Sequence, residues 1–318
     1  MADEEPDTRD LSRANVSAFV MNAGRPVERP RVTFDLIPEL RLPDGGWHDA
    51  LSVVVGDVAL GIVSYTGGAG PTNRSPAATP LPARAITNMM SIDFVAGIPL
   101  DARDLVARAE PFVRRGHDVL RIGDVRAGGD DGPVVARTSS WWHVIEGGHD
   151  PRARAADKAE AHEQGEASNG SFDAMAGAAD AIAVPDDLAL LDPGRSPLAA
   201  LLGLRLTRAD ESGVDALLLD QSRFRNSGGT LFGGACGLLL TLAAEAAIHA
   251  QTPGIRVIPN NVVVHYLRPA GGGTVPVRCT GSVLRRGRNV AHADAVAFAN
   301  DGRPAVTARL TAALEPQG

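Results

Sequence analysis

The sequence predicts an α+β protein of two tandem units, each a long central helix wrapped by a curved antiparallel sheet. Three observations lead to this fold class. Short motifs of the first half recur in the same order in the second half. Each half contains one helical segment that is apolar on almost every face, which is typical of a helix buried on all sides. Segments of alternating apolar and polar residues follow each helix and predict strands with one buried face.

Composition sets the boundaries of the units. Residues 1–14 are polar and acidic and are predicted to be disordered, and residues 15–147 are predicted to form the first unit. Residues 148–185 are dense in Ala, Glu, Gly and Asp and have no apolar period, which predicts a flexible linker. Residues 186–318 complete the chain as the second unit, and 318 residues are enough for two cores.

The duplication rests on paired segments. Residues 114–117 (Arg-Arg-Gly-His) are echoed by residues 285–288 (Arg-Arg-Gly-Arg), and each is followed by an alternating strand and an Asp-Gly turn. Upstream, residues 88–94 resemble residues 261–267, and both segments are predicted to be extended. The central helices are expected at residues 51–62 and 235–248.

Each central helix carries one carboxylate among its apolar residues, Asp57 in the first and Glu245 in the second. A carboxylate in such a helix is costly to bury unless it is paired or functional. Desolvation among the neighbouring valines would raise the basicity of Asp57 toward working pH.

Composition also excludes several classes of protein. The net charge of −7 and the pI near 5.6 argue against nucleic-acid binding, which needs a basic surface. The two cysteines, Cys236 and Cys279, and the eight histidines show no disulfide or metal-ligand spacing, so we expect a cytoplasmic protein without a metal or cofactor. The N-terminus has no apolar signal core, and the segment 235–250 is judged too short and too polar to span a membrane.

The segment most suited to chemistry is the glycine-rich turn at residues 226–235 (Asn-Ser-Gly-Gly-Thr-Leu-Phe-Gly-Gly-Ala). It opens the second apolar helix, where free backbone N–H groups at a positive helix end suit a developing negative charge. A related segment, residues 44–50 (Asp-Gly-Gly-Trp-His-Asp-Ala), precedes the first helix. The two copies therefore hold different pieces of one predicted site.

The second copy resembles the hotdog-fold acyl-CoA thioesterases of the hydroxybenzoyl-CoA and phenylacetyl-CoA type. Their motif is Asn, a Gly three residues on, a hydrophobic residue, His-Gly-Gly, and a carboxylate nine residues after the His. This chain matches it at Asn226, Gly229, Leu231, Gly233 and Gly234, and also in residues 266–269 and 286–288. Phe232 stands at the position of the His, and Thr241 at that of the acid.

The first copy has the opposite pattern. His48 fits the His position and Asp57, nine residues later, fits the acid position. Leu42 replaces the Asn, and Asp49-Ala50 replaces the two glycines.

In that family two units pair, and each site takes its acid from one unit and its oxyanion-binding turn from the other. The resemblance implies a working site made of Asp57, Asn226, Gly233 and Gly234. The opposite site would be made of His48, Asp49, Thr241 and Glu245. Because the opposite site lacks the glycine turn, we expect one working site per chain.

Three further residues are candidates for substrate binding: His48, and Arg286 and Arg288 for the phosphates of CoA. Each candidate has a structural alternative. Asp57 can cap a backbone group, the glycine pair can serve close helix packing, His48 can pack at a helix start, and turn arginines are usually solvated. Cys236 is expected to be a small core residue rather than an activated thiol.

The resemblance implies an acyl-CoA thioesterase whose small-molecule substrate brings CoA with it, so that no separate cofactor is needed. Asp57 would act as a base or as a nucleophile. We expect a monomer of paired units or a homodimer. Two alternatives stay open: a hotdog enoyl-CoA hydratase, for which His48 is the one candidate His, and a non-catalytic acyl-CoA-binding module.

Overall fold

The computed structural model describes residues 31–65, 84–110, 113–145, 184–219, 221, 224, 230–272 and 275–316. The predicted disordered N-terminus and nearly all of the predicted linker lie outside these residues. The described elements of the first half are β1 (Arg31–Asp35), the short 3-10 helix η1 (Pro38–Leu40), α2 (Leu51–Tyr65), β2 (Arg84–Phe94), β3 (Asp104–Ala109), β4 (Val113–Arg115), β5 (Asp118–Ala127) and β6 (Val134–Ile145).

The second half repeats this order of a long helix followed by antiparallel strands. Its described elements are η2 (Asp186–Leu191), α4 (Pro197–Leu202), β7 (Leu204–Asp210), β8 (Gly213–Leu218), α5 (Gly233–Gln251), β9 (Ile255–Tyr266), β10 (Val277–Arg286), β11 (Val290–Phe298) and β12 (Pro304–Pro316).

The described strands form one antiparallel sheet, ordered β1-β3-β5-β6-β2-β9-β12-β11-β10-β8-β7, with β4 paired to β5. The order reads outward from a central pair, β2 and β9, in nearly the same way on both sides. Met90 lies opposite Val264 and Ser91 opposite Val263. The two segments whose sequences resemble each other, 88–94 and 261–267, are therefore the strands that join the halves.

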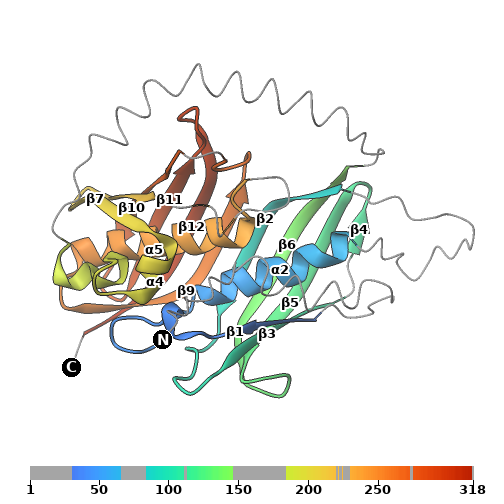
Figure 1. The fold of residues 1–318 in the computed structure, drawn as a ribbon, viewed down its shortest axis with the longest axis horizontal. Helices are drawn as coiled ribbons and strands as arrows, with labels where there is room; N and C mark the ends of the chain where they lie inside the picture. The colour runs from blue at the N-terminus through green and yellow to red at the C-terminus, as the bar shows by residue number, and fades with distance from the viewer. Residues whose placement is uncertain are drawn as a thin grey trace, which may run out of the picture.

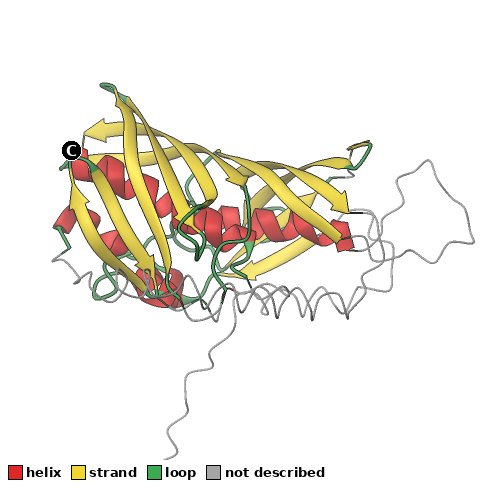
Figure 2. Cartoon of the chain, turned by 90° about the horizontal axis from the view of Figure 1, so that it is seen from above, coloured by secondary structure: helices red, strands yellow, loops and turns green. Residues whose placement is uncertain are grey.

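Both long helices lie on the same side of this sheet, α2 over the first half and α5 over the second (Figures 1 and 2). The alternation expected in the second half is confirmed, because Val277, Cys279 and Gly281 of β10 face the core and their neighbours do not. One cluster of buried apolar side chains runs through both halves, and a smaller one surrounds Trp142. The chain thus buries its two helices under a shared sheet.

The helix α5 is longer than the sequence indicated. It spans 19 residues, which is long and apolar enough to cross a membrane by length and composition, so the expectation that it is too short and too polar was wrong. However, 83% of its apolar stretch is buried inside the protein. Its apolar side chains pack against the sheet and against α2, as those of the central helix of a folded core do.

The two helices approach each other closely at two glycines of α5. A Cβ atom on Gly237 would lie 2.5 Å from Val53 Cγ1, and one on Gly234 would lie 2.9 Å from Val54 Cα. Small residues on α5 therefore set how closely the helices approach. The first turns of α5 lie against the first half of α2.

Candidate active site

The structure joins Asp57 of the first half to the glycine turn of the second. Asp57 Oδ2 accepts a hydrogen bond from the Gly234 N–H at 2.7 Å, across 177 residues of sequence. Gly234 is the second residue of α5, where the N–H groups have no partner within the helix and the helix end is positive. The predicted partnership of this carboxylate with this turn is present as a direct contact.

Asp57 sits in an environment that makes its carboxyl group basic. Its side chain is buried, and Oδ1 has no hydrogen-bond partner among the described residues. Burial raises the pKa of Asp57 to about 7, although the bond from Gly234 opposes the shift. A buried carboxyl with a free oxygen and a pKa near neutrality is suited to proton transfer.

Each glycine of the pair is needed for a different reason. A Cβ atom on Gly233 would lie 2.9 Å from Asp57 Oδ2, so a side chain there would displace the carboxylate. A Cβ atom on Gly234 would instead meet the Phe232 ring at 2.7 Å and the main chain of Val54 at 2.9 Å. Gly233 leaves room for the acid, and Gly234 serves close helix packing, which was the structural alternative.

Gly234→Ala is expected to reduce stability by about 1–3 kcal/mol, because the new methyl group must push α2 and α5 apart. The same movement lengthens the contact between Asp57 and residue 234. Urea unfolding measures the loss. Gly97→Ala is the matched control, because a Cβ atom there has only Asp49 Oδ1 nearby, at 4.0 Å. Equal stability of the two variants would contradict the packing role of Gly234.

Tyr266, the last residue of β9, completes the surroundings of the turn. Its hydroxyl donates to the Gly233 carbonyl at 3.0 Å. The sequence singled out residues 266–269 as a strand end and gave Tyr266 no role at the site. Only the fold reveals that this strand end reaches the first turn of α5.

A second pair of buried ionisable side chains, His48 and Glu245, lies at the other end of the contact between α2 and α5. His48 Nε2 lies 3.0 Å from Glu245 Oε2, although not in the direction of a good hydrogen bond, and His249 Nε2 lies 3.7 Å from Glu245 Oε1. The Ala50 N–H donates to His48 Nδ1 at 3.0 Å, so in the neutral ring Nε2 carries the proton. Each helix thus sends one carboxylate to the start of the other, and the two helices run antiparallel.

This pair is electrostatically unlike Asp57. Burial alone would raise the pKa of Glu245, but His48 and His249 outweigh burial and hold it at about 2. Burial alone would likewise lower the pKa of His48, but Glu245 and Asp49 raise it overall. Two nearby histidines hold Glu245 as an anion, whereas no cation among the described residues contributes to the pKa of Asp57.

Thr241 and Asp49, the other expected members of the opposite site, form hydrogen bonds with backbone groups. The Thr241 hydroxyl donates to the Gly237 carbonyl at 2.8 Å, within its own helix. Asp49 Oδ1 accepts from the Ile98 N–H at 3.2 Å. Glu245 therefore faces His48 directly, Asp49 acts on His48 through its charge, and Thr241 bonds within its own helix.

The candidate CoA-binding arginines lie far from Asp57. Arg286 and Arg288 are exposed at the turn between β10 and β11, and Arg286 Nη1 donates to the carbonyl of Gln251. Gln251 is the last residue of α5, roughly 27 Å along the helix from Gly233 at 1.5 Å per residue. The structure does not bring these arginines to the Asp57 carboxylate.

The remaining predicted residues divide into two groups. Asn226 and Gly229 lie outside the described residues. Phe232, at the position of the motif's His, precedes α5 as its N-cap without a side-chain bond to the helix. Cys236 is buried, and burial raises the pKa of its thiol, so the prediction of a small core residue is confirmed.

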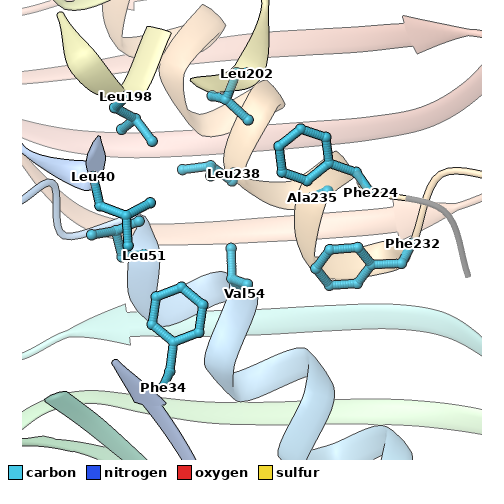
Figure 3. Close-up of a pocket in the computed structure, with 10 residues that line it drawn as sticks. All are labelled: Phe34, Leu40, Leu51, Val54, Leu198, Leu202, Phe224, Phe232, Ala235 and Leu238. Carbon is cyan, nitrogen blue, oxygen red and sulfur yellow. The ribbon is translucent and has the colours of Figure 1, made fainter. Parts of the chain in front are cut away.

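A small apolar cavity lies where the starts of the two helices meet, about 10 Å³ in volume (Figure 3). Leu51 and Val54 line it from α2, and Ala235 and Leu238 from α5, all within two turns of Asp57 or Gly234. The other lining residues are Phe34, Leu40, Leu198, Leu202, Phe224 and Phe232. Its lining is entirely apolar, so it offers hydrocarbon groups a dry surface. Across the described segments, no cluster of three or more His, Cys, Asp or Glu side chains could hold a metal ion.

Comparison with known proteins supports the reading of the second half. Residues 221–313 match the family model of the acyl-CoA thioesterase N-terminal domain. This segment is a thioester hydrolase domain. The predicted enzyme class is thereby confirmed, while the match covers less than half of the chain and leaves the subtype open. Sequence comparison with curated proteins gives no match.

Solved structures show the fold of the chain as a whole. The tesB protein of Mycobacterium avium subsp. paratuberculosis aligns with 94% of this chain, and the alignment includes 99% of the tesB chain. The two share 10% sequence identity, with a TM-score of 0.56. A hotdog-fold protein of unknown function from Alicyclobacillus acidocaldarius aligns with 91% of this chain over 94% of its own length. The two share 11% sequence identity, with a TM-score of 0.53. The predicted α+β hotdog fold is confirmed at this level.

Proposed function

We propose that the chain is a tandem double hotdog that hydrolyses acyl-CoA thioesters at one composite site per chain. The supporting observation is the 2.7 Å contact between Asp57 of the first unit and the Gly234 N–H of the second. It joins a base with a pKa of about 7 to a positive helix start. In thioester hydrolysis, the base activates water and the positive helix start stabilises the oxyanion.

The thioester carbonyl would bind at the start of α5 and take over the Gly234 N–H from Asp57. The freed carboxylate would remove a proton from water, whose oxygen attacks the carbonyl carbon and places negative charge on the carbonyl oxygen. A preorganised N–H donor stabilises such an oxyanion by roughly 3–4 kcal/mol. When the intermediate collapses, the C–S bond breaks and the Asp57 carboxyl returns its proton to the CoA sulfur.

A nucleophilic route uses the same residues. Asp57 would attack the carbonyl carbon and expel CoA as its thiolate, which takes a proton from solvent, and water would then hydrolyse the acyl-aspartyl anhydride. A single turnover in H₂¹⁸O separates the base route from a nucleophilic route in which water attacks the Asp57 carbonyl of the anhydride, because that attack leaves the solvent oxygen in Asp57 and not in the released acid. Under either route, Asn226 would orient the water or the carbonyl.

The apolar cavity beside the site is the proposed location of the acyl group. It adjoins the glycine turn through Phe232 and Ala235, and its lining offers no polar partner. A hydrocarbon acyl group, aliphatic or aromatic, is therefore the expected substrate, with CoA outside. A cavity of about 10 Å³ must widen to admit it, and side-chain movement of the lining phenylalanines is the simplest way.

Free-thiol release over a panel of acyl-CoAs tests the proposal, with enoyl-CoA hydration measured beside it. Hydration without hydrolysis would favour the hydratase, for which the close approach of His48 and Glu245 is the specific observation. Binding without either reaction would favour a binding module. Cytoplasmic location and a homodimer stay predictions, and light scattering at several concentrations decides the second.

The hydrolysis rate is expected to depend on pH in a specified direction. The base form of Asp57 is the ionised one, and its pKa is about 7. The kcat/KM value should therefore fall about tenfold per unit as the pH drops below 7 and level off above it. A profile that stays flat between pH 5 and 8 would contradict a role for Asp57 as the base.

A further inference from the structure

One peptide group of the site is held at both ends. It joins Gly233 to Gly234, so its carbonyl belongs to Gly233 and its N–H to Gly234. The Tyr266 hydroxyl donates to the carbonyl at 3.0 Å, and the N–H donates to Asp57 at 2.7 Å. Three segments of the chain, β9, α5 and α2, therefore meet in one line of hydrogen bonds.

A bond to the carbonyl of a peptide changes the behaviour of its N–H. Accepting a hydrogen bond pulls electrons toward the carbonyl oxygen and makes the N–H a stronger donor, so that consecutive hydrogen bonds reinforce each other. The same bond fixes the plane of the peptide, which directs the N–H. At an oxyanion site, both the strength and the direction of the donor determine the rate.

The position of Tyr266 makes it a rigid support for the peptide. It ends β9 and lies opposite Val306 of β12, and the next residue, Leu267, donates its N–H to the Ala305 carbonyl. Its backbone is thus fixed by the sheet and not by the helix that it contacts. Burial raises the pKa of its hydroxyl well above the ordinary value, with Asp57 adding to the shift, so Tyr266 stays a donor.

We propose that Tyr266 is a positioning residue of the thioesterase site, whose hydroxyl aims and polarises the 233–234 peptide that supplies the oxyanion donor. This inference rests on the proposed function. Tyr266 contacts the donor peptide through the carbonyl side and leaves the N–H side to Asp57 and the substrate. It acts on the transition state through the peptide and not by touching the acyl group.

Tyr266→Phe tests the proposal because it removes only the hydroxyl. We expect kcat to fall about 3- to 30-fold, less than the roughly 10²- to 10³-fold cost of removing a donor outright. The KM value should change by less than about twofold, because the hydroxyl does not bind the ground state. The acid limb of the pH profile should move to higher pH, since a weaker N–H donor stabilises the Asp57 carboxylate less.

Thr252→Val is the matched control. It removes another buried hydroxyl that donates to a carbonyl of α5, that of Ile248 at 2.7 Å, at the opposite end of the helix. It should leave kcat and the acid limb unchanged while costing similar stability. If Tyr266→Phe behaves like this control, with only lower stability, Tyr266 is a structural residue and the proposal is overturned.

A second measurement does not depend on activity. The Asp57 side-chain carbon can be titrated by ¹³C NMR in aspartate-labelled protein and assigned by its loss in Asp57→Asn. The midpoint should rise in Tyr266→Phe and stay in place in Thr252→Val. If no acyl-CoA is hydrolysed by the unmodified chain, the proposed function fails, but this titration still decides whether Tyr266 polarises the 233–234 peptide. An unchanged midpoint would refute it.

Discussion

Asp57→Asn is expected to lower kcat for acyl-CoA hydrolysis by about 10²- to 10⁴-fold, the usual contribution of a general base. The amide keeps the size of the carboxylate and can still accept the Gly234 N–H bond, so the geometry at the start of α5 survives. What is lost is the basicity that burial confers. Asp35→Asn, at the exposed end of β1, is the matched control and should retain full activity. Full activity in Asp57→Asn would reject the assignment of the base.

The same substitution is expected to change how stability depends on pH. The folded protein holds the proton of Asp57 up to about pH 7, whereas the unfolded chain releases it near the ordinary value of 3.8. Stability of the unmodified protein therefore falls as the pH rises from about 4 to about 7, and is constant above. Relative to it, Asp57→Asn should gain a few kcal/mol across this window, at about 1.4 kcal/mol per pKa unit.

Urea unfolding of both proteins at pH 5 and at pH 8 measures that gain. The stability difference between Asp57→Asn and the unmodified protein at pH 8 is compared with the same difference at pH 5. A constant offset from the new amide group, which leaves a donor where Oδ1 had no partner, cancels in the comparison. If the stability difference between Asp57→Asn and the unmodified protein does not grow from pH 5 to pH 8, the pKa of Asp57 is not raised in the fold.

Glu245→Gln is expected to have the opposite effect on stability. The folded pKa of Glu245 is about 2, below its ordinary value of 4.5, because His48 and His249 stabilise the charge against the cost of burial. The stabilisation is present above about pH 4.5 and is lost as the pH falls toward 2. At pH 7, Glu245→Gln should therefore lose a few kcal/mol, as when one partner of a buried pair is removed.

Thioester hydrolysis should survive Glu245→Gln at temperatures where the variant is folded, because Glu245 lies at the far end of the helix contact from Gly234. Turnover is measured beside the unfolding midpoint for both variants. If folded Glu245→Gln lost hydrolysis while Asp57→Asn kept full activity, the working site would lie at His48 and Glu245 and not at Asp57 and Gly234.

Much of the fold could be predicted because its signals are periodic and duplicated. The alternation of β10 and β12 specifies a buried face, and the recurrence of residues 88–94 at 261–267 indicates equivalent strands. The contact between Asp57 and the glycine turn could also be predicted, because Asp57 stands nine residues after His48, at the acid position of the family motif that the sequence resembles.

The other features of the site depend on three-dimensional contacts that the spacing of residues in the sequence does not specify. The register between the helices is set where Gly237 meets Val53, and it brings Glu245 to His48 and leaves Thr241 in its own helix. Arg286 matches a motif in sequence, yet the length of α5 carries it away from Asp57. Tyr266 reaches the turn only because β9 crosses beneath α5.

The most direct test of the composite site is a crystal structure with an acyl-CoA analogue in which a methylene group replaces the thioester sulfur. The account predicts one analogue per chain, with its carbonyl oxygen about 3 Å from the Gly234 nitrogen. Its acyl group should lie in the cavity between α2 and α5 (Figure 3). A carbonyl bound beside His48 and Glu245, or away from both helix starts, would contradict it.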